Sequence, residues 1–213
     1  MKKLFYLPVT CLVFASSVVT TFAAQKTFLE MTSGDCIRTE SKKDSVDKKS
    51  MTQEESFMER YNAIKESYAS LTPVACGQYA AASNTKEKFM ERYNQIKAAY
   101  PKLTDVYGNY AGSDYALEDF TKRYYEIKDT YPGLTKWFGE YAASKKTLPE
   151  FMKRYNQAKD SSPVLASCYG QYAASDNDLP EFLARYNGIK ASNTGMKNCF
   201  GEYAGCTKKL SNK

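Results

Sequence analysis

The sequence predicts an all-α protein: a tandem array of five helix-turn-helix (αα-hairpin) repeats of about 31 residues, solenoid-like or bundled. Three observations predict this class. One sequence block occurs five times, a second block follows each copy of the first, and both blocks carry the apolar period of an amphipathic helix. A single hairpin cannot bury both of its apolar stripes, so we expect neighbouring hairpins to share a core.

The first 23 residues have the pattern of a cleavable signal peptide. Lys2 and Lys3 precede an apolar run, and Thr21 and Ala23 place small residues at the −3 and −1 positions of a cleavage point. No other apolar run approaches the ~18 residues that a transmembrane helix needs. We therefore expect a secreted chain without a transmembrane segment, extracellular or, in a bacterium, periplasmic or on the cell surface.

The remaining chain divides by composition and by repeat. Residues 24–51 are rich in Lys, Ser and Asp and predict a flexible polar arm. Residues 52–205 hold the five repeats, with approximate boundaries at 52–83, 84–113, 114–144, 145–175 and 176–205. Residues 206–213 form a short basic tail.

The first block of each repeat predicts a long helix. Its copies begin at regularly spaced phenylalanines: Phe57, Phe89, Phe120, Phe151 and Phe182. In the second copy, Phe89, Tyr93, Ile96 and Tyr100 follow the helical period and predict a core-facing stripe. Helix starts are predicted by capping residues at four places: Thr52-Gln-Glu-Glu55, Asn84-Thr-Lys-Glu87, Thr147-Leu-Pro-Glu150 and Asp178-Leu-Pro-Glu181. Pro101, Pro132 and Pro163 predict where they end.

The second block predicts a shorter helix. Leu103, Val106, Tyr107, Tyr110 and Ala111 again follow the helical period in the second copy, and the pattern returns in the others. Each copy contains Gly-x-Tyr-Ala. A glycine inside a helix costs roughly 1 kcal/mol against alanine, so its return in every copy predicts a close approach between helices.

One arginine recurs three residues after each phenylalanine: Arg60, Arg92, Arg123, Arg154 and Arg185. On a helix this position flanks the apolar stripe. Two interpretations remain open. The arginines clamp the repeats by packing on a tyrosine and donating to an acid or a helix-end carbonyl, or they form a periodic cationic track that binds a polyanion or another partner.

Five cysteines remain after signal cleavage and predict disulfides in an oxidising compartment: Cys36, Cys76, Cys168, Cys199 and Cys206. Cys168 and Cys199 occupy equivalent, core-facing positions. We expect Cys206 to bond to Cys199 or Cys168 and staple the last hairpin, and Cys36 to bond to Cys76.

The composition favours a binding role without catalysis. The chain has no histidine, which excludes His-based triads and His-ligated metals, and it has no P-loop, dinucleotide or Gly-x-Ser-x-Gly motif. We therefore expect no enzyme activity, no cofactor and no metal. The formal net charge of +6 falls to about +4 after cleavage and is interspersed, which argues against nucleic acid as a partner.

We expect an interaction module for an extracellular or host protein or glycan, acting as an effector or at a surface. The alternative is a structural, matrix or ligand-sequestering protein, including one that binds an acidic glycan through the periodic arginines. The sequence leaves the partner, the disulfide connectivity, the oligomeric state and the choice between an open solenoid and a closed bundle undetermined.

Overall fold

The computed structural model describes residues 54–211, which belong to one compact unit. The predicted signal peptide, the predicted arm and Cys36 lie outside the described residues. Within them the secondary structure is helical, without strands, so the prediction of an all-α fold is confirmed. None of these helices combines the length and the apolar character that crossing a membrane requires.

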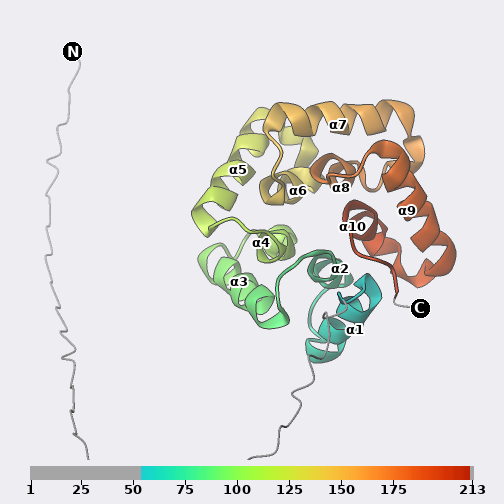
Figure 1. The fold of residues 1–213 in the computed structure, drawn as a ribbon. Coiled ribbons are helices and arrows are strands. Elements are labelled where there is room, and N and C mark those ends of the chain that lie inside the picture. Colours follow the sequence, from blue (N-terminus) through green and yellow to red (C-terminus); the bar gives the residue numbers. More distant parts are fainter. Residues whose placement is uncertain (1–53, 212–213) are drawn as a thin grey trace, which may run out of the picture. The chain divides into compact units, whose positions relative to one another are not determined.

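Long outer helices alternate along the chain with short inner helices (Figure 1). The outer helices are α1 (Phe57–Ser67), α3 (Lys86–Ala99), α5 (Leu117–Thr130), α7 (Leu148–Ser161) and α9 (Leu179–Ser192). The inner helices are α2 (Pro73–Ala81), α4 (Tyr107–Gly112), α6 (Phe138–Ala143), α8 (Tyr169–Ala174) and α10 (Phe200–Gly205). Each outer helix packs against the inner helix that follows it.

The helix starts agree only in part with the predicted caps. Thr147 forms the predicted capping box with Glu150, and Asp178 accepts from the backbone N–H of Glu181. Two predicted caps are wrong. The cap of α1 is Ser56 and not Thr52, because Ser56 forms the capping box with Glu59. The cap of α3 is Thr85 and not Asn84, because the Asn84 side chain donates to the carbonyl of Ala111, 2.7 Å away. The outer helices α3, α5 and α7 end just before the predicted prolines.

The second block is shorter as an α-helix than its apolar period predicts. Four of the inner helices are preceded by 3-10 segments: Thr104–Val106, Pro132–Trp137, Pro163–Leu165 and Thr194–Cys199. The α-helical part begins only after a residue in the bridge region, such as Val106 (φ −116°, ψ 6°) or Trp137 (φ −115°, ψ 4°). This break turns the chain from the outer layer to the inner one.

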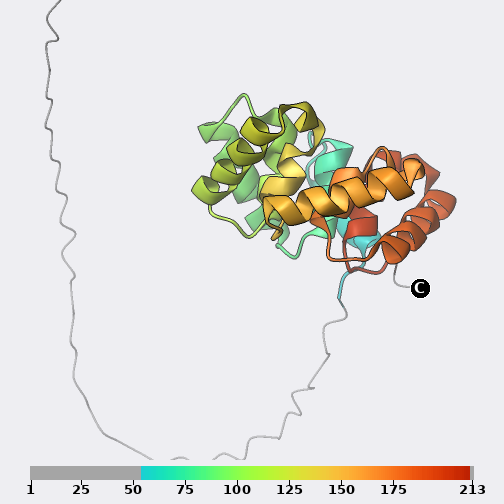
Figure 2. The same ribbon diagram turned by 90° about the horizontal axis from the view of Figure 1, so that it is seen from above.

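The inner helices form a closed ring around a central axis (Figure 1). Consecutive inner helices contact one another from α2 to α10, and α10 in turn contacts α2. The outer helices surround this ring, and the view turned by 90° shows α7 running along its outside (Figure 2). Helices from the two ends of the domain therefore lie side by side.

The core between the two layers is aromatic. The phenylalanine that begins the first block is fully buried in all five copies, as are Ile64, Ile96, Ile127 and Ile189. The tyrosine of each inner helix meets the phenylalanine of the next outer helix edge to face, with ring centroids 5.3–5.4 Å apart. These pairs are Tyr79–Phe89, Tyr110–Phe120, Tyr141–Phe151, Tyr172–Phe182 and Tyr203–Phe57.

The repeated glycine permits the inner helices to approach closely, as its recurrence predicts. A Cβ atom on Gly170 would lie 2.4 Å from the Trp137 ring, and one on Gly77 would lie 2.8 Å from the Cys199 sulfur. Trp137 and Cys199 each stand two residues before the glycine of their own inner helix. In both contacts, between α6 and α8 and between α10 and α2, the residue two positions before the glycine of one helix packs against the glycine of the other.

The segment after α10 completes the ring. The backbone N–H groups of Phe57 and Met58 donate to the carbonyls of Lys209 and Leu210, at 2.9 and 3.0 Å. The Lys208 ammonium group is almost fully buried and lies 2.9 Å from the Glu54 carboxylate. The predicted basic tail thus includes residues that bond to the start of α1.

Candidate functional site

The five periodic arginines lie between the outer and inner layers. Each Nη2 donates both to the carbonyl of the inner-helix tyrosine and to a carbonyl in the loop that follows, at 2.6–3.1 Å. Each guanidinium carbon also lies 4.1–4.3 Å from the centroid of that tyrosine ring, in the pairs Arg60–Tyr79, Arg92–Tyr110, Arg123–Tyr141, Arg154–Tyr172 and Arg185–Tyr203. A polyanion at these arginines would have to displace these interactions.

The predicted disulfides at Cys206 are wrong: Cys76, Cys168, Cys199 and Cys206 are all free thiols. Cys199 and Cys206 cap opposite ends of α10, about 10 Å apart along the helix axis, whereas a disulfide needs Cα atoms within about 7 Å. Cys168 is placed like Cys199, at the start of the neighbouring helix α8. Cys76, the predicted partner of Cys36, lies in the core.

The side chains of Cys168 and Cys199 instead pack against glycines of neighbouring inner helices, Gly201 and Gly77. The Cys199 sulfur donates to the carbonyl of Pro73, 3.1 Å away across the joint between α10 and α2. Burial raises the pKa of the Cys168 and Cys199 thiols to about 12. A thiol that holds its proton at neutral pH is a poor nucleophile, so neither cysteine suits covalent catalysis.

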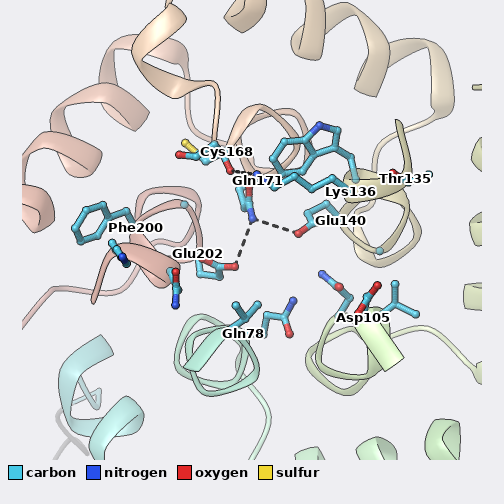
Figure 3. A pocket seen from close by; sticks show the side chains of 18 residues that line it. Gln78, Asp105, Thr135, Lys136, Glu140, Cys168, Gln171, Phe200 and Glu202 are labelled. Atoms are coloured by element: carbon cyan, nitrogen blue, oxygen red, sulfur yellow. Dashed lines mark hydrogen bonds between the residues drawn. The ribbon is translucent and has the colours of Figure 1, made fainter. Parts of the chain in front are cut away.

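A cavity of about 520 Å³ opens on the ring axis (Figure 3). It is lined by residues of the inner helices and of the segments that lead into them. Trp137, Phe200 and Val106 contribute apolar wall, and exposed polar residues surround the mouth: Asp105, Thr135, Lys136, Ser167, Lys197 and Asn198. A volume of this size matches small-molecule sites in proteins.

The cavity contains one polar side chain from every inner helix. These five residues, the axial ring, occupy the position directly after the repeated glycine: Gln78, Asn109, Glu140, Gln171 and Glu202. The ring also lines a second hollow of about 210 Å³, bounded by small residues such as Ala143, Ala174 and Gly205. Four members, Asn109, Glu140, Gln171 and Glu202, line both spaces.

One amide joins the two acids of the axial ring (Figure 3). The Gln171 Nε2 donates to Glu140 Oε1 at 3.2 Å and to Glu202 Oε1 at 3.4 Å. The side-chain amide oxygen of Gln171, Oε1, is buried and has no hydrogen-bond partner in the described residues. Such an unpaired polar atom is costly in a folded protein.

Both glutamates hold protons more tightly than ordinary carboxylic acids do. Burial raises the pKa of Glu140 to about 7 and that of Glu202 to about 8, although bonds from Asn109 and Gln171 and the charge of Lys136 oppose this change. Glu202 is 8% exposed, whereas Glu140 keeps a partly exposed side chain inside the cavity. The two carboxyl groups therefore titrate near neutral pH.

Lys136 stands at the mouth and does not pair with either acid. Its ammonium group donates to the carbonyl of Ser167 at 3.0 Å and lies 4.5 Å from the centroid of the Trp137 ring. Within residues 54–211, no group of three or more Cys, Asp or Glu side chains is arranged to hold a metal ion.

The axial ring was not predicted, although the sequence carries a signal for it. In Gly-x-Tyr-Ala the variable residue is always Gln, Asn or Glu, inside a block that is otherwise apolar. A polar residue kept at one position of a buried helix suggests a shared polar interior. The site residues predicted from the sequence are the periodic arginines and the cysteines. None of them belongs to the axial ring.

Comparisons of the chain with protein-family models, with curated proteins and with solved structures found no match.

Proposed function

We propose that this chain is an exported binding protein without catalytic activity, and that the axial cavity holds a small polar ligand. The proposal joins two lines of support. The pattern of residues 1–23 favours export, and the axial ring favours ligand binding. It corresponds to the ligand-sequestering alternative that the sequence leaves open.

The architecture in this proposal is an array of five αα-hairpins of about 31 residues, closed into a ring. The five-fold recurrence of the Arg–Tyr and Tyr–Phe contacts supports this assignment. The contact between α10 and α2 matters for function because it closes the ring, so that the residues after the repeated glycines face a common central axis. An open array would present the residues after the repeated glycines along one exposed surface instead of directing them at a common centre.

The axial ring carries the proposal. A ring of helices that served only as a scaffold would be most stable with apolar side chains on its axis, because buried polar groups cost free energy unless they are fully paired. Here five polar side chains surround a cavity of about 520 Å³, and among the described residues the side-chain Oε1 of Gln171 has no hydrogen-bond partner. Binding of a polar ligand accounts for a polar side chain at this position in all five copies.

The sequence favours binding over catalysis. The chain has no histidine and no P-loop, dinucleotide or Gly-x-Ser-x-Gly motif, and burial keeps the Cys168 thiol beside the cavity protonated. The two axial acids are therefore proposed as ligand-binding groups.

Ligand-observed NMR on the full chain tests the proposal. The sample would be a mixture of small amines, amino acids, polyols and carboxylic acids. We expect saturation transfer to at least one compound and its loss in Ser167→Trp, which places a large side chain at the cavity mouth. Ser161→Trp, at an exposed position on α7, is the matched control. Absence of any binder, or binding that survives Ser167→Trp, would contradict the proposal.

A macromolecular partner at the outer surface is the second candidate, and Tyr125 favours it. The other four copies carry asparagine at this position, but Tyr125 is a tyrosine on α5 that is 41% exposed. Exposed tyrosines often anchor protein interfaces. If the outer surface binds an extracellular protein or glycan here, Tyr125→Asn should abolish its capture from extracellular fluid, while Ser167→Trp should leave capture unchanged.

A further inference from the structure

We infer that the ligand of the axial cavity carries a protonated amine, which lies between the carboxyl groups of Glu140 and Glu202. The inference rests on the proposed function, because it names the chemical class of ligand for the same cavity. Glu140 on α6 and Glu202 on α10 reach the axis on either side of Gln171, which comes from α8 between them (Figure 3).

The first argument is that the ionised form of each acid has no cationic partner among the described residues. A carboxyl group inside a protein is normally ionised only where a cation pairs with it, and otherwise it keeps its proton. Within residues 54–211, neither Glu140 nor Glu202 takes part in any of the salt bridges. Lys136 is the nearest candidate, but its ammonium group is bonded to the Ser167 carbonyl. A cationic ligand would supply the charge that the chain does not.

The second argument is the balance of donors and acceptors. One amide nitrogen of Gln171 serves an oxygen of each glutamate, at 3.2 and 3.4 Å, so both oxygens lie within reach of a single donor group. An ammonium group has three donors and no acceptor, and it forms short, charge-assisted bonds to carboxylates. Placed between the two acids, it would release the Gln171 amide from bridging them, so that the side-chain Oε1 of Gln171 could turn toward the ligand as a third acceptor.

The rest of the cavity suits a short carbon chain. Trp137 and Phe200 line it with apolar surface, and the mouth carries the carboxylate of Asp105 together with the ammonium groups of Lys136 and Lys197. Between Glu140 and Glu202, an amine fits better than a dicarboxylate of equal length, which would bring negative charge toward two acids. A neutral diol could satisfy the same acceptors but would gain no charge-assisted bonds.

Binding of the amine should be linked to proton release. The titratable and charged groups around the two glutamates are Lys136, Lys197 and Asp105 at the mouth, Cys168 at the start of α8 and Cys199 at the start of α10, while α2 contributes the uncharged amide of Gln78. Burial raises the pKa of Glu140 and Glu202 to about 7 and about 8. A primary amine like that of lysine stays protonated to about pH 10. Affinity should therefore rise between pH 6 and pH 8.5, as the acids ionise.

Isothermal titration calorimetry of the full chain with three probes of equal carbon length tests the inference: 1,4-diaminobutane, 1,4-butanediol and succinate. We expect the diamine to bind at pH 8.5, and to bind about tenfold or more weakly at pH 6. Glu140→Gln and Glu202→Gln should each weaken diamine binding about tenfold or more at pH 8.5. Glu66→Gln, at an exposed position on the outer helix α1, is the matched control and should change nothing.

Thermal melts at pH 8.5 separate loss of binding from loss of folding, because both Gln variants should be at least as stable as the parent chain at that pH. Preference for the diol or for succinate, absence of diamine binding, or diamine binding that ignores both Gln substitutions would overturn the inference. If the diamine fails but another compound of the NMR mixture binds and is excluded by Ser167→Trp, only the inference of an amine ligand is overturned. If no compound of the mixture binds, the proposed function is overturned as well.

Discussion

Tyr203 meets Phe57 edge to face, with ring centroids 5.3 Å apart, although the two residues stand at opposite ends of the helical domain. The pair has the same geometry as Tyr141 and Phe151 in the middle of the chain, at 5.4 Å. The joint between the last and first helices is therefore built as an internal joint is. This joint is also held by hydrogen bonds from the backbone N–H groups of Phe57 and Met58 to the carbonyls of Lys209 and Leu210.

Double-mutant cycles test whether this joint is closed in solution. We expect Phe57→Leu and Tyr203→Leu to couple by about 0.5–1.5 kcal/mol in the free energy of unfolding, as edge-to-face pairs do. The cycle for Phe151→Leu and Tyr141→Leu is the internal reference and should give a similar value. A coupling near zero for Phe57 and Tyr203 alone would mean that the ring opens at this joint.

Glycine substitutions test the close approach of the inner helices. Gly170→Ala should lower the free energy of unfolding by about 1–3 kcal/mol, because the new Cβ would meet the rigid Trp137 ring. Gly188→Ala on α9 has nothing within 4 Å and should raise it by up to about 1 kcal/mol through helix propensity. Denaturant titration measures both values. Equal effects of the two substitutions would refute the steric role of Gly170.

Arg123 tests the role of the periodic arginines. Its guanidinium group donates to the carbonyls of Tyr141, Ser144 and Lys146 and lies over the Tyr141 ring. Arg123→Met should destabilise the fold by about 2–4 kcal/mol, because it leaves these carbonyls without a charged donor. Arg123→Lys should recover only part of the loss, because an ammonium group lacks the planar fork.

The same variant distinguishes the two interpretations of the arginines. If they bind a polyanion, Arg123→Lys should retain elution from a heparin column, since the charge is kept, and Arg123→Met should elute earlier by about the same amount as Lys122→Met on the exposed surface of α5. If they only hold the fold, Arg123→Met should alter stability and leave the elution of the folded protein unchanged.

The two axial acids predict how stability depends on pH. Their pKa values in the folded protein, about 7 and about 8, lie above the ordinary value of 4.5. Between pH 4.5 and pH 8 the folded state holds protons that the unfolded state has released. The two acids therefore add to the free energy of unfolding below about pH 4.5, and this stabilisation is lost as pH rises through 7 and 8. The loss should be on the order of a few kcal/mol.

Urea denaturation of the parent chain and of the double variant Glu140→Gln/Glu202→Gln, from pH 4.5 to pH 8.5, measures this contribution. We expect the parent chain to lose stability across the range and the double variant to be nearly flat, so that the variant is the more stable at pH 8.5. Parallel pH profiles for the two proteins would show that the glutamates do not carry the effect.

Much of the local structure follows from the sequence. The apolar period and the prolines predicted the long helices, and the buried Phe and Ile stripe agrees with them. The errors concern residues with competing partners. Asn84 is used for a bond to Ala111 and not as a cap, and Cys206 accepts a bond from Arg185 and donates one to Tyr203 in place of forming a disulfide.

By itself the sequence determined the helices, their five-fold recurrence and the apolar stripes, because each depends on residues within a few positions of one another. Only the tertiary structure decided that the inner helices close into a ring and that Glu140, Gln171 and Glu202 meet on its axis. Closure depends on the small rotation from each inner helix to the next. That rotation is set by how side chains such as Trp137 and Cys199 pack against glycines of other helices, and a repeat period does not encode it.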